Sequence, residues 1–154
     1  MSPITPEIRL CAERSVLCWL ATVSSDGQPN VSPKEIFAIH DDEHLVIAEI
    51  ASPNTLSNLT NNPKACCSFV DVFRQKGFKL SGEIEVVPPS DDRFPALAKP
   101  LEAMTKGVFP IRHVMLMRVT AVAPILAPSY WMFPGTTEEQ MIEGGCRLYG
   151  VRPV

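Results

Sequence analysis

Short apolar runs separated by polar turns make up most of the chain, and this pattern predicts β-strands rather than long helices. The turn after the first run contains Asp26-Gly27, a pair typical of tight β-hairpins. A second polar turn at 40–43 precedes the third run, so we expect the first three strands in sequential antiparallel order. The predicted strands are residues 16–23, 29–39, 45–48, 65–72, 78–87 and 114–122.

Helix-start signals stand between these runs. Ser52 followed by Pro53 is typical of a helix cap and a first helical position, and it leaves unpaired backbone amides at the helix start. Pro95 and Pro100 should make the third helix short, kinked or split. Residues 136–140 contain a capping-box pattern for a final short helix. The expected helices are 5–15, 52–62, 90–106 and a segment that begins near residue 136.

About six strands in mostly antiparallel order, with few helices and no long polar linker, favour one closed or partly closed β-barrel. We expect a single domain over residues 1–154, with a core at 16–122 and a tail with a short helix at 123–154. A chain of 154 residues fits one domain. Its 45% hydrophobic and 20% charged residues are ordinary for a soluble globular protein.

The charge balance argues against two classes of partner. A net charge of -3 provides no overall positive field for a phosphate backbone, so nucleic acid is not expected to bind. No apolar run approaches the roughly 20 residues that cross a bilayer, so no membrane association is expected. The N-terminus lacks the basic-then-apolar order of a signal peptide, and we therefore expect a cytoplasmic protein.

The cysteines and histidines show no catalytic or metal-binding pattern. The five cysteines are odd in number and lie mostly among apolar neighbours, which suits reduced, buried thiols. Cys66 and Cys67 are adjacent, so in a strand they point to opposite faces and would not share a ligand. His40, His44 and His113 lack metal-ligand spacing, so no metal site is expected. Nothing pairs a serine with a histidine and an acid, and the catalytic residues stay unknown.

Three segments combine polar side chains with turn or helix-start signals. Residues 31–35 place a hydroxyl, a proline and a cation inside a predicted strand, a break that suggests a bound ligand. Residues 52–55 offer helix N-terminal amides and hydroxyls, groups that hold phosphate well, although a purely structural cap explains them too. Residues 74–77 add two cations and a glycine that permits close approach; the alternative is a solvated hairpin tip.

The order of these segments resembles the pyridoxamine 5'-phosphate oxidase-like FMN-binding split β-barrels. The resemblance runs from about Leu17 to Val87 and is carried by LATVSSDGQPNVSPKEIFAI, LVIAEIASPNTLSNLTNNPKACCSFVD and FRQKGFKLSGEIEV. It implies a mainly β fold, a six-stranded antiparallel split β-barrel with peripheral helices. It also implies a homodimer that holds FMN at the subunit interface. The residues that match the family's FMN contacts are Ser32, Pro33, Lys34, Ser52, Asn54, Thr55, Arg74, Gln75 and Lys76.

The resemblance also assigns roles within this set. Residues 32–34 pass beside the flavin, with Lys34 directed at the phosphate or the pyrimidine edge, and residues 52–55 hold the phosphate end. Residues 74–76 meet the ring or the phosphate, from the same or the other subunit. Many relatives carry a lysine or arginine where this chain has Asn54, so the phosphate charge must rest on Lys34 or on the cations of 74–76. Both Lys34 and Arg74 are expected to be surface groups.

The resemblance implies an FMN-dependent oxidoreductase that acts on a small molecule or accepts electrons from a donor. A non-catalytic flavin binder or electron carrier is the alternative, as is a binder of deazaflavin or haem with the same fold. Tyr130 and Trp131 lie in a tail that, in similar proteins, folds against the cofactor site or the partner subunit. Packing alone explains these two aromatics equally well.

Overall fold

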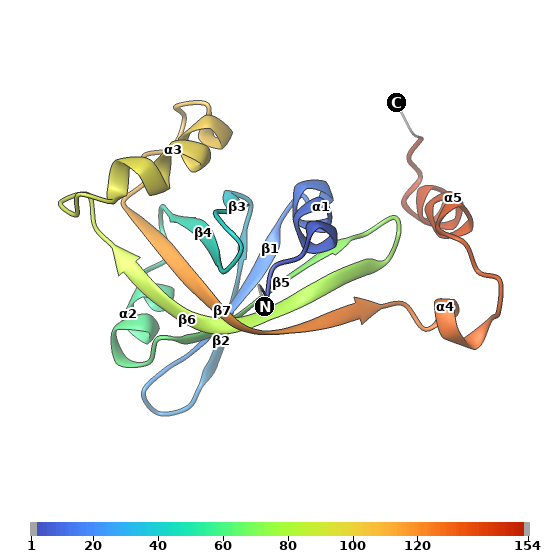
Figure 1. Ribbon diagram of the computed structural model, residues 1–154, viewed down its shortest axis with the longest axis horizontal. Coiled ribbons are helices and arrows are strands. Elements are labelled where there is room, and N and C mark those ends of the chain that lie inside the picture. Colours follow the sequence, from blue (N-terminus) through green and yellow to red (C-terminus); the bar gives the residue numbers. More distant parts are fainter. Residues whose placement is uncertain (1–2, 153–154) are drawn as a thin grey trace.

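Seven strands form one antiparallel sheet in the computed structural model, which describes residues 3–152 (Figure 1). The strands follow the order β2-β1-β5-β6-β7-β4-β3 across the sheet. The sheet curls on itself, so the mainly β split-barrel fold is confirmed, with seven strands in place of six (Figure 1). The strands are β1 Cys18–Val23, β2 Pro29–Lys34, β3 Phe37–Ile39, β4 His44–Glu49, β5 Lys64–Asp71, β6 Lys76–Val87 and β7 His113–Leu126.

The extra strand arises because the predicted single strand 29–39 is divided at residues 35–36. β2 pairs with β1 as the predicted hairpin, whereas β3 pairs with β4. These partners lie at opposite ends of the strand order, so the short connection carries the chain from one edge of the sheet to the other. Curling brings the two edges near each other, and residues 35–36 cross the seam between them. The expected antiparallel pairing of successive strands is therefore present, but the two halves of the predicted middle strand pair at opposite edges of the sheet.

A long two-stranded ribbon of β6 and β7 forms the middle of the sheet and continues beyond it (Figure 1). β7 runs four residues past its predicted end, because Lys76 to Val87 pairs along its whole length. β4 accompanies β7 only as far as Arg118. The rest of β7 therefore pairs with β6 on one side only, and its other edge is open. Pro124 lies in this part, where a residue without a backbone N–H is tolerated.

Two apolar clusters form the interior. The larger fills the curled sheet beneath α1 and includes Leu20, Phe69 and Met117. The smaller packs α3 against β4 and β7 through Leu97 and Leu101. The period-2 burial of β6 agrees with the alternation in the sequence. Among the described residues, Cys11, Cys18 and Cys67 are buried free thiols, as expected.

In the described part of the chain, five helices lie outside the sheet, and their ends only partly match the prediction. The third begins at Phe94, later than expected, and continues through Pro100. Pro100 and the carbonyl-bearing residue four positions earlier are both exposed, so water can satisfy the carbonyl that proline leaves unbonded. The capping box of the last helix is confirmed between Thr137 and Gln140. The helices are α1 Pro6–Arg14, α2 Pro53–Asn61, α3 Phe94–Thr105, α4 Ser129–Met132 and α5 Glu138–Tyr149.

Within residues 3–152, none of the helices has the length and apolar character that crossing a bilayer requires. The last two helices, α4 and α5, belong to a C-terminal arm, residues 127–152, which extends away from the curled sheet at the end of β7 (Figure 1). This arm and the start of α2 lie at opposite ends of the molecule (Figure 1). Part of the predicted ligand-binding set lies at the end of β2 and the start of α2, and the rest lies at the β5–β6 turn, beside the arm.

Candidate functional site

The end of β2 and the start of α2 lie together and form a polar cluster. Lys34, the last residue of β2, donates a hydrogen bond from Nζ to Oγ of Ser52, the residue before α2. The hydroxyl oxygens of Ser32 and Thr55 are 3.4 Å apart. A cavity of about 320 Å³ lies against these groups. We call this set of residues the β2–α2 cluster: Ser32, Pro33, Lys34, Ser52, Asn54 and Thr55.

Lys34 is the buried cation of the cluster. Only 8% of its surface is exposed, so the expectation of a surface group is wrong. Burial lowers the pKa of its ammonium group, and the nearby Glu49 and Cys18 raise that pKa. The Ser52 hydroxyl and the Glu49 charge offset part of the cost of removing the ammonium from water. The Lys34 ammonium is therefore held at the cavity of the β2–α2 cluster, whereas the ammonium of a surface lysine is mobile.

Glu49 is a site residue that the sequence analysis missed. It ends β4, and only 2% of its surface is exposed. Its Oε1 accepts a hydrogen bond of 2.7 Å from the backbone N–H of Ser52. Its Oε2 lies 3.3 Å from Nδ1 of His113 on β7. Glu49 therefore fixes the turn before α2, and the signal for it was an acid at the end of the apolar run LVIAE.

The start of α2 offers backbone amides, but not in the way that the Ser52-Pro53 pattern indicates. Ser52 occupies the cap position and Pro53 the first turn, as predicted. The Ser52 side chain makes no capping hydrogen bond, because its hydroxyl faces Lys34. The amides of Asn54 and Thr55 have no partner inside the helix at these positions. They therefore remain available to a ligand at the cluster.

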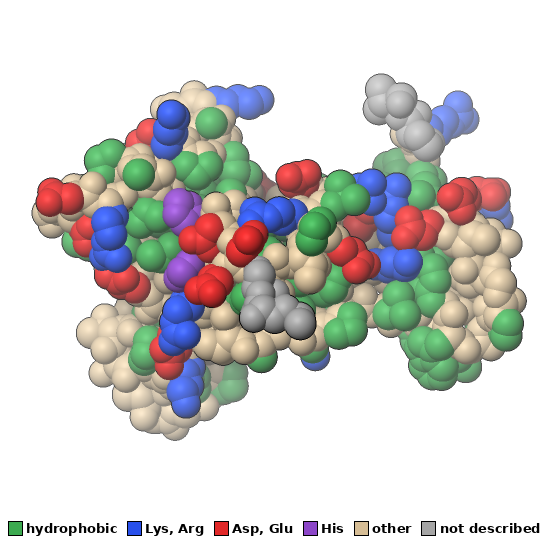
Figure 2. Space-filling view, viewed as in Figure 1, with side chains coloured by type: hydrophobic (Ala, Val, Ile, Leu, Met, Phe, Trp, Pro, Cys, Tyr) green, Lys and Arg blue, Asp and Glu red, His purple; other side chains and the backbone are tan. Residues whose placement is uncertain are grey.

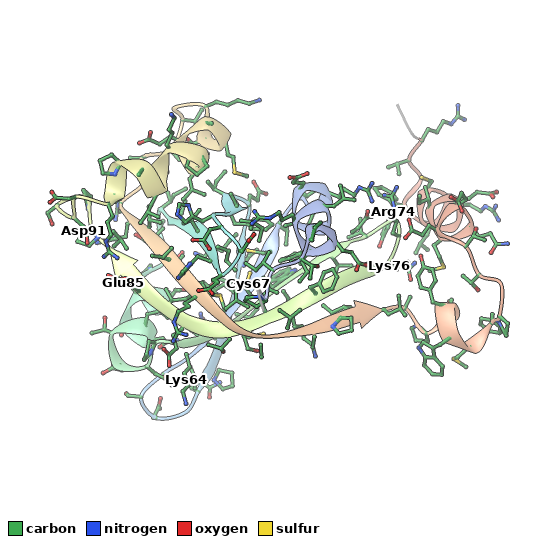
Figure 3. The ribbon with its side chains drawn as sticks, in the orientation of Figure 1. Lys64, Cys67, Arg74, Lys76, Glu85 and Asp91 are labelled. Carbon is green, nitrogen blue, oxygen red and sulfur yellow. The ribbon has the colours of Figure 1, made fainter. Side chains whose placement is uncertain are left out.

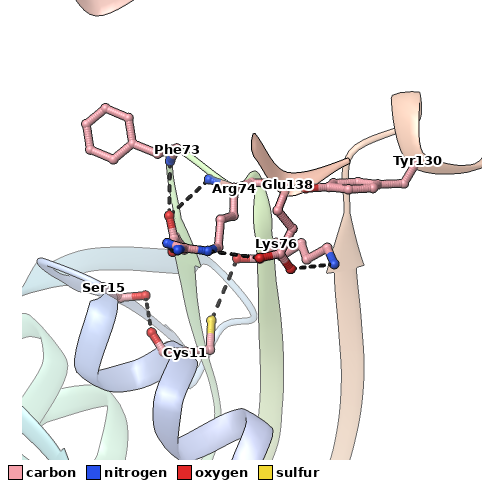
Figure 4. Close-up of polar contacts among 8 residues, drawn as sticks. Cys11, Ser15, Phe73, Arg74, Lys76, Tyr130 and Glu138 are labelled. Carbon is pink, nitrogen blue, oxygen red and sulfur yellow. Dashed lines mark hydrogen bonds and ion pairs between the residues drawn. The ribbon is translucent and has the colours of Figure 1, made fainter. Parts of the chain in front are cut away.

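The remaining predicted residues lie at the β5–β6 turn, in a second cluster with the C-terminal arm (Figure 4). Arg74 donates from Nε to Glu138 at 3.0 Å and from Nη1 to Asp71 at 2.8 Å. Lys76 Nζ lies 2.8 Å from the same Glu138 and 4.6 Å from the ring centre of Tyr130. The Tyr130 hydroxyl donates to the Arg74 carbonyl at 2.7 Å. We call these five residues the hairpin-tip cluster.

Electrostatics within the hairpin-tip cluster are balanced. Hydrogen bonds from Lys76 and then Arg74 hold the pKa of Glu138 below its usual range. The Arg74 side chain is 28% exposed, so it is a partly covered group rather than a free surface cation. A cavity of about 510 Å³ adjoins the cluster beneath α1, with Leu10 and Phe78 among its apolar lining. Both cations are already neutralised by carboxylates, and in this chain they fasten the arm to the turn.

Gln75 and Gly77 have structural roles at this turn. Gln75 adopts a left-handed backbone with φ of 52°, and its carbonyl accepts the N–H of Ala127 at 3.1 Å. A Cβ on Gly77 would lie 2.1 Å from the carbonyl oxygen of Phe69. Glycine is therefore required there by the pairing of β5 with β6, so its presence does not by itself indicate a ligand.

The structure does not bring the two predicted sets together within one chain. Arg74 and Lys76 lie beside the C-terminal arm, whereas the β2–α2 cluster lies at the far end of the ribbon (Figures 1 and 3). The arm also carries exposed apolar side chains, visible as a hydrophobic group in Figure 2. Trp131, for example, is 68% exposed. Of the two tail aromatics, Tyr130 packs on the turn and Trp131 does not.

A Glu138→Gln substitution is expected to loosen the C-terminal arm without unfolding the barrel. The change removes the charge that pairs with Arg74 and Lys76. Exposed pairs contribute little, about 1 kcal/mol or less in total, so the melting temperature should hardly move. Limited proteolysis should cut the arm faster. Glu139→Gln, an exposed neighbour, is the control.

Acid should have a similar effect on the wild-type arm. The pKa of Glu138 is lowered in the folded state. The stabilisation that Glu138 gives the arm is therefore complete at pH values above the ordinary glutamate pKa, and it is lost as the pH falls through the lowered pKa of the folded state. Unchanged cleavage in the Gln variant and at acid pH would show that these ion pairs do not hold the arm.

Comparison with solved structures places the fold among known proteins. A proposed pyridoxamine 5'-phosphate oxidase from Lactobacillus delbrueckii is 27% identical over 80% of this chain and 95% of its own, with a TM-score of 0.65. HupZ of Group A Streptococcus is 25% identical, and the match covers 77% of this chain and 91% of HupZ, with a TM-score of 0.66. An FMN-binding protein from Syntrophomonas wolfei is 17% identical, and the match covers 78% of this chain and 84% of that protein, with a TM-score of 0.66.

Other structures with this fold carry names that refer to different cofactors. They include an F420 reductase, a FAD-binding protein from Mesorhizobium loti and a heme binding protein from Mycobacterium smegmatis. No protein with a curated description matches the chain. The sequence profile of the pyridoxamine 5'-phosphate oxidase family, however, matches residues 4–125, most of the chain. Together with the curled seven-stranded sheet, that match shows that the chain belongs to the pyridoxamine 5'-phosphate oxidase family.

Proposed function

We propose that this protein binds FMN through the β2–α2 cluster and serves as an FMN-dependent oxidoreductase acting on a small molecule. The observation that carries the proposal is the buried ammonium of Lys34, held beside the hydroxyl of Ser52 at the start of α2. Keeping a charged lysine out of water costs free energy, and an anionic ligand beside it offsets that cost. Membership of the pyridoxamine 5'-phosphate oxidase family and a protein of the same fold that is named for FMN support that choice of ligand.

The donors of the cluster fit a phosphate group. Lys34 supplies one full charge, Ser32 and Thr55 supply hydroxyls, and the amides of Asn54 and Thr55 point out of the helix start. The Asn54 side chain is exposed and brings no charge. Phosphate affinity therefore rests largely on Lys34, supported by Glu49, which orders the Ser52 backbone.

We also propose that the protein works as a homodimer. The β5–β6 turn and the start of α2 lie at opposite ends of the chain's fold, so the two predicted sets do not meet within one chain (Figure 1). In a dimer, Arg74, Gln75 and Lys76 of a second copy can approach the β2–α2 cluster. Light scattering of the purified protein tests this: a dimer is expected, and a monomer with FMN bound would contradict the shared site.

Bound FMN would supply hydride or electron transfer at its ring. The chain itself would bind the phosphate, orient the cofactor and shape the approach of the substrate. The apolar residues beside the cluster, Ile36, Ile50 and the exposed Phe109, suit a non-ionic surface of a ligand. A flavin binder without turnover remains the second candidate, because among the described residues the cluster contains no acid-base pair directed at an open cavity.

The decisive experiment is a visible spectrum of the purified protein, followed by mass spectrometry of any released ligand. A yellow protein that releases FMN, or that takes up added FMN in stoichiometric amount, is expected. Oxidation of NADH or NADPH with a defined acceptor would support the oxidoreductase, whereas bound FMN without turnover would favour the binder. Release of a deazaflavin or haem, or no uptake of FMN, would contradict the proposed cofactor.

A further inference from the structure

A second cavity opens on the other side of the contact between Lys34 and Ser52. Its volume is about 260 Å³, and it shares Pro33, Lys34, Ala51 and Ser52 with the cavity of the β2–α2 cluster. This volume is below the roughly 300–1,000 Å³ of typical ligand pockets, so it is better described as one end of a longer groove. The residues that line only this end are Glu35, Ile36, Ala48, Ile50 and Phe109.

The chemistry of the groove changes at Lys34. On one side stand hydroxyls, an amide side chain and the start of α2. On the other side the floor is apolar, and Ile36, Ala48 and Ile50 belong to the cluster that packs α3 against β4. A groove of this kind suits an elongated ligand with an anionic end and an apolar end. It does not suit free phosphate, which would use only the polar half.

Phe109 stands at the apolar end and remains 55% exposed. Its loop is tied at both ends. The Thr105 hydroxyl accepts the N–H of Gly107 at 3.2 Å, and the Thr105 carbonyl accepts the N–H of Val108 at 3.0 Å. Beyond the ring, the N–H of Arg112 donates to the Glu49 carbonyl at 2.9 Å. The exposed ring is thus held beside the groove.

Glu49 links the two halves. Its side chain orders the backbone of Ser52 at the polar half, and its carbonyl anchors the loop that carries Phe109. One buried residue therefore fixes both ends of the groove relative to each other. A single exposed aromatic is ordinary on a protein surface. Here Glu49 holds both the loop of the exposed aromatic and the backbone of Ser52, the partner of the buried cation, and this shared anchor is a stronger indication of a ligand.

We propose that Phe109 is a further cofactor-binding residue that contacts the planar ring end of the cofactor, with the phosphate end at Lys34. The inference rests on the proposed function, because it assumes that the β2–α2 cluster holds the phosphate of FMN. A phenyl side chain gains attraction from offset or edge contact with a planar ring, and this contact does not depend on the ligand's charge. Phe109 therefore acts on the ring, and Lys34 acts on the phosphate.

The test compares Phe109→Ala with Phe109→Trp and with Val108→Ala, a control whose side chain is 68% exposed in the same loop. Dissociation constants for FMN and riboflavin are measured by flavin fluorescence, and the visible spectrum of bound flavin is recorded. Phe109→Ala should weaken both ligands by the same factor, on the order of tenfold. It should also shift the spectrum, whereas Phe109→Trp keeps affinity and quenches the flavin more strongly.

Three results would overturn the inference. Wild-type affinity and spectrum in Phe109→Ala would show that the ring is not a contact. A loss of affinity for FMN alone, with riboflavin unaffected, would place Phe109 at the phosphate end. An equal loss in Val108→Ala would indicate a general disturbance of the loop. Absence of FMN binding by the wild-type chain would instead refute the proposed function itself, and the inference with it.

Discussion

A Lys34→Met variant is expected to bind FMN about 10 to 100 times more weakly than the wild type while its affinity for riboflavin stays the same. Methionine keeps most of the apolar stem of this buried side chain but removes the ammonium. The phosphate then loses its one charged partner in the β2–α2 cluster, and riboflavin has no phosphate to lose. Fluorescence titration with both ligands measures the difference.

The pH dependence gives an independent check on the same residue. Burial lowers the pKa of Lys34, so its ammonium loses a proton at a pH below the ordinary lysine range of about 10.4. Wild-type affinity for FMN should fall as pH rises through that lowered pKa, and the Met variant should show no such fall. Lys64→Met, an exposed lysine after α2, is the control (Figure 3). Equal FMN affinity in the Lys34 variant and the wild type would remove Lys34 from the site.

Local sequence signals predicted those parts of the fold that depend on local chemistry. The alternation in 78–87 predicted β6 because each of its faces meets a different environment. Thr5-Pro6 and Thr137 predicted helix starts, because their hydroxyls accept nearby backbone N–H groups. The break at 35–36 was missed, because the seam depends on how the whole sheet curls and not on residues near it.

The candidate site shows the same limit more clearly. The turn at 52–55 was predicted from its own residues, and its place beside residues 32–34 matches the family resemblance. The burial of Lys34 was not predicted, because lysine is rarely buried without a partner, and Ser52 lies 18 positions away. Likewise, Arg74 and Lys76 looked like free cations, because their shared partner Glu138 lies more than 60 residues further along the chain; Asp71, the second partner of Arg74, lies only three residues before it and was overlooked.

Replacement of Gly82 by alanine is expected to destabilise the protein by about 3 kcal/mol or more, enough to prevent folding of a marginally stable chain. Gly82 lies at the irregularity where the register of β6 against β7 shifts. A Cβ there would stand 2.0 Å from the carbonyl oxygen of Arg118, and backbone cannot move aside as a flexible side chain can. The ribbon would have to separate where both of its strands line the apolar interior.

Urea denaturation of Gly82→Ala against Gly144→Ala separates this clash from the general effect of replacing a glycine. Gly144 lies inside α5, and apart from its chain neighbours and the backbone of its own helix no atom stands within 4 Å of the Cβ that alanine would add. Alanine there should leave stability unchanged or raise it by up to about 1 kcal/mol, because it favours the helix more than glycine does. If Gly82→Ala unfolds at the wild-type urea concentration, the close pairing of β6 with β7 at this position is wrong.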